Sequence, residues 1–329
     1  MRILVSVDIE GIAGVVHPDH ARPGNADYER ARRWMTAEAS AAIAGARAGG
    51  ATDVIVNDSH GDFRNLLAET IDPSARLLQG KPRELGMMAG VEDGCVAVFL
   101  VGWHAKAMAA GVLAHTINST AFARVLVNGD EAGELALYGG VAAEFGAPVA
   151  FVSGDDRCVA EAAALFPNAV GVAVKTAHGH RSATSLSSAA ACAAIEAGAR
   201  TAAHRDVAHR AAADASERAR AGGKPRLRRS LRDVAARSSR RRRHAGILVA
   251  DDASRGARAE QSVGDVIHAS LKVASALAPR HPELFVQRPQ RIAHHRQPCA
   301  KPQRGQRGER AVQREREWRA NQPCERTGG

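Results

Sequence analysis

Two acidic side chains follow directly on an apolar run near the start of the chain. In SVDIEG (6–11), Asp8 and Glu10 stand two positions apart, just after the apolar residues 3–5. Two uncompensated charges at the end of a buried strand would be costly. Either water solvates these carboxylates in a loop, or a cation binds them.

Two histidines stand at comparable places. His60 comes three residues after the apolar stretch DVIVN (53–57), and His104 follows AVFLVG (97–102). In open α/β sheets, ligands bind at the carboxyl ends of the parallel strands, so we expect both histidines to gather beside the two carboxylates. Imidazole nitrogen and carboxylate oxygen, without sulfur, suit Zn²⁺ or Mn²⁺ in a catalytic site.

Each of these residues also has an ordinary structural explanation. A single histidine after a strand is usually a loop residue or a hydrogen-bonded core residue, and Asp8 or Asp58 could cap a turn through its side chain. HGH (178–180) resembles a metal-binding pair, but neighbouring loop histidines are more often solvated. Asp155 and Asp156 open a predicted helix, where N-capping explains them.

The elements that must position these residues alternate between strand and helix over the first 200 residues. The predicted strands are Arg2–Val7, Asp53–Asn57, Ala97–Val101, Ala123–Asn128, Pro148–Val152 and a weaker Gly171–Val174. The predicted helices are Tyr28–Ala48, Glu134–Phe145, Asp156–Leu165 and an alanine-rich helix from about Ser187 to Ala203. Short apolar strands separated by amphipathic helices indicate an α/β domain, with a mostly parallel sheet between two helical layers (three-layer αβα), over residues 1–204.

Charge divides the chain into two regions. Residues 1–200 carry 16 Lys and Arg against 22 Asp and Glu, whereas residues 201–329 carry 29 against 13. We therefore expect residues 205–329 to form an Arg-rich, poorly ordered region, in which only 245–250 and 263–277 could pack. A frameshift near residues 200–215 is a second explanation, because GC-rich codons read out of frame yield this composition.

The same composition bears on which partners the protein has and on where in the cell it is located. Nucleic-acid binding by the basic region is the non-enzymatic alternative. It is the less favoured one, because the aromatic residues of this region are limited to Phe285 and Trp318 and no binding motif occurs. No apolar stretch is long enough to cross a bilayer, and the start of the chain does not read as a secretory signal. Five scattered cysteines without CxxC spacing indicate reduced thiols, so we expect a cytoplasmic protein.

A series of motifs in the first 200 residues resembles the zinc-dependent D-aminopeptidase family of the DppA type. The motifs are, in chain order, SVDIEGIAGV (6–15), YERARRWMTAEA (28–39), VNDSHGD (56–62), VGWHAK (101–106), AHTIN (114–118), GELAL (133–137), FVSGDDRCVAEA (151–162) and AVKTAHGHRSATSLS (173–187). The resemblance implies two zinc ions per subunit and a catalytic histidine, which corresponds to His115. The zinc ligands that it implies are Asp8, Glu10, His60, His104 and Glu134.

The resemblance also implies an activity. Two zinc ions would offset the carboxylates, with Asp8 as the candidate bridge, and would lower the pKa of a bound water toward about 7. His115 would act as base, acid or nucleophile in hydrolysing short peptides with an N-terminal D-residue, such as D-Ala-D-Ala. Family members assemble into ring-shaped, decamer-like homo-oligomers and continue into a small second α/β domain. Residues 205–329 lack the pattern of that domain.

A different enzyme class also fits paired metals. A dinuclear-metal phosphoesterase would use the same ions for phosphoryl transfer and would need further basic groups to hold phosphate. Lys106 is the one candidate for that role near the predicted site.

Overall fold

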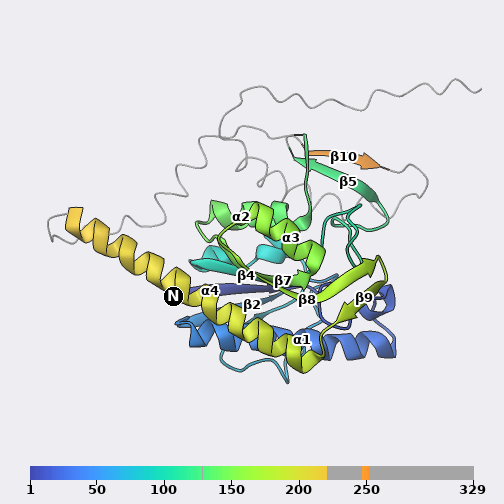
Figure 1. The fold of residues 1–329 in the computed structure, drawn as a ribbon, viewed down its shortest axis with the longest axis horizontal. Coiled ribbons are helices and arrows are strands. Elements are labelled where there is room, and N and C mark those ends of the chain that lie inside the picture. Colours follow the sequence, from blue (N-terminus) through green and yellow to red (C-terminus); the bar gives the residue numbers. More distant parts are fainter. Residues whose placement is uncertain (128, 221–246, 252–329) are drawn as a thin grey trace, which may run out of the picture. The chain divides into compact units, whose positions relative to one another are not determined.

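The computed structural model describes residues 1–127, 129–220 and 247–251, with side chains for residues 1–127 and 129–205 (Figure 1). The strands are β1 (Arg2–Val7), β2 (Asp53–Asp58), β3 (Arg76–Leu78), β4 (Ala97–Trp103), β5 (Phe122–Val127), β6 (Asp130–Glu131), β7 (Val149–Asp155), β8 (Val170–Gly179), β9 (Ser182–Ser185) and β10 (Ile247–Asp251). The α-helices are α1 (Ala26–Ala48), α2 (Glu134–Glu144), α3 (Asp156–Leu165) and α4 (Ser188–Arg220), with short 3-10 turns η1 (Pro18–Ala21), η2 (Gly86–Met88) and η3 (Val91–Asp93).

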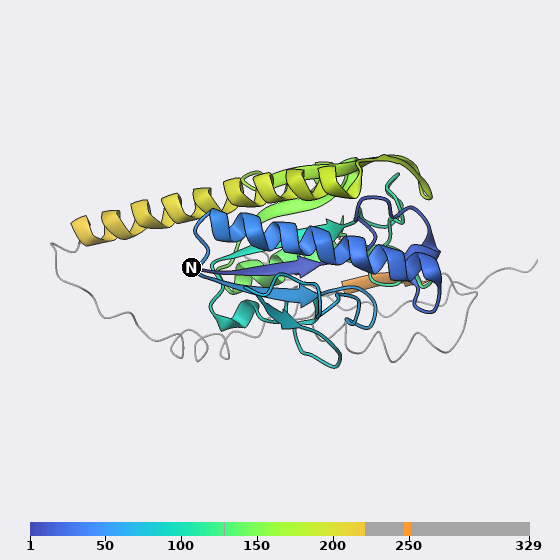
Figure 2. The same ribbon diagram turned by 90° about the horizontal axis from the view of Figure 1, so that it is seen from below.

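A seven-stranded sheet forms the middle layer. Its strand order is β3-β2-β1-β4-β7-β8-β9, and every neighbouring pair is parallel except β8 with β9. Helices α1 and α4 lie side by side along one face, and α2 and α3 cover the other (Figures 1 and 2). This arrangement confirms the three-layer αβα fold expected from the sequence.

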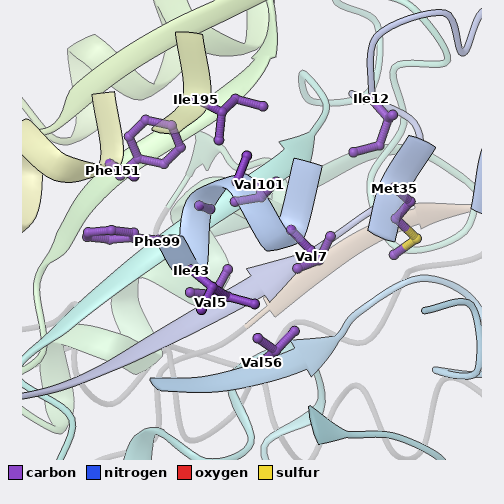
Figure 3. Close-up of a cluster of buried hydrophobic side chains, with 14 of the residues drawn as sticks. Val5, Val7, Ile12, Met35, Ile43, Val56, Phe99, Val101, Phe151 and Ile195 are labelled. Atoms are coloured by element: carbon purple, nitrogen blue, oxygen red, sulfur yellow. The ribbon is translucent and has the colours of Figure 1, made fainter. Parts of the chain in front are cut away.

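The alternation of side chains along each strand divides the core between the two faces. In β1, Ile3, Val5 and Val7 point toward α1 and α4, whereas Leu4 points toward α2. Figure 3 shows the first of these cores, where Met35 of α1 and Ile195 of α4 meet the strands. A strand that is buried on both faces is a continuous run of apolar residues, and such runs predicted these strands from the sequence.

Most predicted elements are confirmed within two or three residues, and the differences have physical reasons. Strands β3, β6 and β9 were not predicted because two to four residues carry no readable period. The last helix runs to Arg220 rather than ending near Ala203, since alanine-rich sequence continues to favour a helix. Strand β10 falls in the predicted packing segment 245–250 and pairs antiparallel with β5.

Some expectations concern residues that the structure does not describe. The predicted low order of residues 205–329, the missing second domain and the frameshift fall largely on residues 221–246 and 252–329, which lie outside the described residues. The domain boundary at residue 204 stays a prediction. Within the described part of the chain, no helix combines the length and apolar character needed to span a bilayer.

A buried acid on α1 makes the stability of this fold depend on pH. Glu38 is fully buried, and its Oε1 accepts a hydrogen bond of 2.9 Å from the backbone N–H of Ala13. Burial raises its pKa to about 7 from the usual 4.5, although the Ala13 N–H and the charge of buried Lys175 act in the opposite direction. A raised carboxyl pKa means that the folded state holds the proton more tightly than the unfolded state does. The stability of the fold therefore falls as the pH rises above the pKa that the carboxyl has in the unfolded chain.

We predict that Glu38→Gln removes this loss. The shift corresponds to about 3 kcal/mol of unfolding free energy lost between about pH 5 and pH 8. Urea unfolding of wild type and variant at both pH values measures it. Relative to wild type, the free energy of unfolding of the variant should be higher at pH 8 than at pH 5 by up to about 3 kcal/mol. The same difference between the two proteins at both pH values would contradict the pKa shift of Glu38.

Candidate active site

The predicted site residues come from three adjacent strands and one helix start. Strands β2, β1 and β4 are neighbours, and at their carboxyl ends the chain continues into His60, Asp8 and His104 respectively. Glu134 is the first residue of α2, on the helical layer beside this edge. The fold therefore brings to one place residues that lie up to 126 positions apart in the sequence.

Two glycines let the loop after β1 lie against the end of β4. The backbone N–H of Asp8 donates to Val101 O at 2.8 Å, and that of Gly11 donates to Gly102 O at 2.7 Å. A Cβ on Gly11 would stand 2.0 Å from the carbonyl oxygen of Trp103, and one on Gly102, whose φ is +68°, would stand 2.3 Å from that of Asp8. Only residues without a side chain allow this approach, which sets the position of Asp8 and Glu10.

Carboxylates and imidazoles face one another in this space. Asp8 is 2% exposed; its Oδ1 lies 3.1 Å from His60 Nδ1 and its Oδ2 lies 3.5 Å from His104 Nε2. Glu10 Oε2 lies 3.0 Å from the same His60 nitrogen. Glu134 Oε1 lies 3.6 Å from His104 Nε2 and 3.7 Å from His115 Nε2. The two oxygens of Asp8 thus face two different histidines.

Backbone carbonyls determine which nitrogen of each ring carries the proton. His60 Nε2 lies 2.8 Å from the carbonyl oxygen of Ala21, and His104 Nδ1 lies 3.0 Å from that of Ala105. His115 Nδ1 is held in the same way by a carbonyl 2.9 Å away. Because a carbonyl only accepts, each of these nitrogens donates, and in a neutral ring the other nitrogen turns a lone pair toward the carboxylates.

His60 compensates only part of the charge in this cluster: burial would raise the pKa of Glu10, but the neighbouring His60 outweighs burial and holds that pKa well below its usual value. Burial, together with the charge of Glu10, raises the pKa of Asp8 well above its usual value. Burial and the neighbouring His115 lower the pKa of His104, whereas the adjacent carboxylates overcome burial and raise that of His60. His104 Nε2 is one of the buried side-chain atoms of the described residues that have no hydrogen-bond partner, and Glu10 Oε2 has only its 3.0 Å ion-pair contact with His60.

These unsatisfied atoms fit a bound cation. Two overlapping groups bring their ligand atoms within 4.8 Å of one another. One group is Asp8, Glu10 and His104; the other is His104, His115 and Glu134. Nitrogen and oxygen donors without a thiolate are those of a catalytic zinc site. His60 adjoins the first group through its contacts with Asp8 and Glu10.

His115 stands in a loop with strained backbone. Its ring stacks on that of His104, with centroids 4.1 Å apart. Leu113 and Ile117, on either side of it, have φ of +51° and +65°. Such conformations are unfavourable for these residues and cluster at functional sites. At Ile117 the strained backbone aims its N–H at Glu134 Oε1, 2.6 Å away.

The other acidic residues weighed from the sequence support loops. Asp58 accepts hydrogen bonds from the backbone N–H groups of Asn65 and Leu66 and so folds the loop after His60. Asp155 caps α3, as predicted, and also accepts from the N–H of Val112 at 2.6 Å. Both therefore hold loops that carry a histidine of the cluster.

Two further candidates lie away from the carboxylates. His178 is exposed, and its Nε2 lies 2.7 Å from Thr184 Oγ1 on the neighbouring strand. Lys106 pairs with Glu131 at 3.1 Å and does not line the cavity described below.

One functional residue was not singled out from the sequence. Lys175 of β8 is 2% exposed, and its Nζ donates to the carbonyl oxygens of Glu10, Ile12 and Val15 at 2.6, 2.9 and 2.6 Å. It thereby ties the loop that carries Asp8 and Glu10 to the sheet. The sequence feature that could have identified Lys175 is its position within the otherwise apolar run GVAVKTA (171–177), since a lysine is rarely buried.

Most of the cluster lines a cavity of about 620 Å³. The lining members are Asp8, Glu10, His60, His115 and Glu134. A space of this size is within the range of small-molecule and short-peptide sites.

Comparison with known proteins identifies the family. A family model described as D-aminopeptidase matches residues 1–220. A curated D-aminopeptidase of Bacillus subtilis (strain 168) is 38% identical over 175 residues, which are 53% of this chain and 64% of that protein. The chain thus matches less than two thirds of the length of this relative.

A solved structure is similar as well. It is the zinc-dependent D-aminopeptidase DppA from Bacillus subtilis, described as a self-compartmentalizing protease, and it aligns with a TM-score of 0.60 at 35% identity. The alignment covers 61% of this chain and 73% of that one. Because the family match spans well over half of its length, the chain belongs to the D-aminopeptidase family.

Proposed function

We propose that this protein is a zinc-dependent aminopeptidase that hydrolyses short peptides with an N-terminal D-residue, of the D-Ala-D-Ala type. The observation that carries the proposal is the convergence of three buried carboxylates with the histidine rings, among which His104 Nε2 is buried without a hydrogen-bond partner. Membership of the D-aminopeptidase family supports the reaction, and the zinc dependence of the similar solved structure supports the metal.

Two zinc ions per subunit would be held by Asp8, Glu10, His60, His104 and Glu134. Asp8 would help to hold both ions, since its two oxygens face His60 and His104 separately. Zinc, when bound, supplies Lewis-acid polarisation of a peptide carbonyl and activation of water. The carboxylates would hold the ions, and the carbonyls of Ala21 and Ala105 keep the two histidine rings in the tautomer that can ligate.

His115 is the proposed catalytic residue. Its Nδ1–H is held by the carbonyl of Leu113, so Nε2 is the ring nitrogen that remains free to react with the substrate. Held 3.7 Å from Glu134, Nε2 can accept a proton as the peptide is attacked and return it to the departing amine. Direct attack by the same nitrogen would use the same lone pair.

Assembly and location are part of the proposal. The similar solved structure is described as self-compartmentalizing, which supports a ring-shaped homo-oligomer for this chain. We place the enzyme in the cytoplasm on the basis of its scattered cysteines. The phosphoesterase alternative is less well supported, because the matching family and the similar solved structure are D-aminopeptidases. Lys106, its predicted phosphate ligand, is paired with Glu131 and does not line the cavity.

Two histidine variants separate metal binding from catalysis. We predict that His104→Ala loses bound zinc and all turnover of D-Ala-D-Ala, whereas His115→Ala keeps both zinc ions and loses turnover by about a hundredfold or more. Metal analysis after gel filtration and an assay of released D-alanine measure the two quantities. His178→Ala, which alters an exposed histidine of the β8–β9 hairpin, is the control and should match wild type. Full turnover of His104→Ala, or loss of zinc from His115→Ala, would contradict the assignment.

Lys175 should act on zinc through the loop that it holds. We predict that Lys175→Met destabilises the fold by about 3 kcal/mol, because three buried carbonyls lose their donor, and weakens zinc binding by about tenfold or more. Competition with a chromophoric chelator, well below the unfolding temperature, measures the affinity. Lys106→Met, at a lysine outside the cavity, is the matched control. Wild-type zinc affinity in Lys175→Met would show that the loop holds its position without the lysine.

A further inference from the structure

Two exposed arginines line the same cavity as the buried carboxylates. Arg22 and Arg181 line it and are exposed, whereas the carboxylates of Asp8, Glu10 and Glu134 line it and are buried. Among the residues that the structure describes, neither arginine has a carboxylate within ion-pairing distance. Their charges are thus available to a ligand.

Backbone contacts hold each arginine next to the cluster. Arg22 directly follows Ala21, whose carbonyl accepts the hydrogen bond of His60 Nε2. Arg181 directly follows His180, whose carbonyl accepts a 2.9 Å hydrogen bond from the N–H of Leu113, two residues before His115. The backbone of each arginine therefore adjoins a carbonyl group that contacts a segment of the site.

A third cation on the cavity wall is already engaged. Lys81 Nζ lies 4.6 Å from the centre of the Phe63 ring, which also lies under Arg83. The two arginines are better suited to an anion, because a guanidinium binds a carboxylate through two parallel hydrogen bonds.

The exposed arginines of the cavity match one end of a short peptide. A short peptide with free ends is zwitterionic, with an ammonium group at one end and a carboxylate at the other. Its carboxylate would be attracted to the exposed arginines, whereas the proposed zinc ions would offset the buried carboxylates at the reacting end. A blocked or amidated C-terminus would leave the arginines without a partner.

We propose that Arg22 and Arg181 bind the C-terminal carboxylate of the substrate, so that the enzyme selects short peptides with a free C-terminus. This inference rests on the proposed peptidase function and adds to it a determinant of specificity. The two arginines act on substrate binding, and the carboxylate–histidine cluster acts on the chemical step.

The test compares D-Ala-D-Ala with its C-terminal amide as substrates of the zinc-loaded, full-length protein. Wild type should hydrolyse the free acid with a kcat/KM at least about tenfold above that of the amide. Arg22→Gln and Arg181→Gln should each raise the KM for the acid by about tenfold, with little change in kcat and little change for the amide. Arg33→Gln, at an exposed arginine of α1 that does not line the cavity, is the matched control and should behave as wild type.

The outcomes separate this proposal from the function on which it rests. If wild type turns over acid and amide equally well, or if the two variants affect both substrates alike, the carboxylate-binding role is wrong and the peptidase function stands. If zinc-loaded wild type hydrolyses neither substrate, the proposed function fails and the specificity inference fails with it. Loss of the preference for the acid in the two cavity variants, with the preference kept in Arg33→Gln, supports the inference.

Discussion

The site depends on the cost of burying Asp8, Glu10 and Glu134 close together. Three carboxylates in a space removed from water repel one another, and the histidine nitrogens that face them carry lone pairs rather than protons when the rings are neutral. A cation offsets both effects. Protons can supply part of the same positive charge, which is why the pKa values of Asp8 and of His60 are raised.

The surrounding structure holds these groups against their repulsion. Neighbouring strands bring the ligands to one sheet edge, and the core under α1 and α4 keeps those strands in register (Figure 3). Gly11 and Gly102 allow the acidic loop to approach β4, and Lys175 ties three of its carbonyls to β8. The strained loop around His115 is held from outside by Asp155 through the N–H of Val112. Fixed placement before a ligand arrives is what a catalytic metal site requires.

Apolar runs predicted the main strands, and the polar residues after three of them predicted where the site lies. His115 and Glu134 were found only through the family resemblance, because a loop histidine and an acid at a helix start have ordinary explanations. Lys175 could have been recognised as a charge within an apolar strand. Arg22 and Arg181 carry no sequence signal, since their role follows from backbone contacts between distant segments. The helix α4 exceeded its expected length because its alanine-rich pattern has no clear end.

The central claim is that the buried cluster is a metal site, and anomalous diffraction at the zinc absorption edge tests it most directly. In crystals of the zinc-loaded protein, the account predicts strong peaks within about 2.0–2.2 Å of Asp8 Oδ2, His104 Nε2 and Glu134 Oε1. Peaks confined to other places on the protein, or ordinary water density among these three side chains, would contradict it.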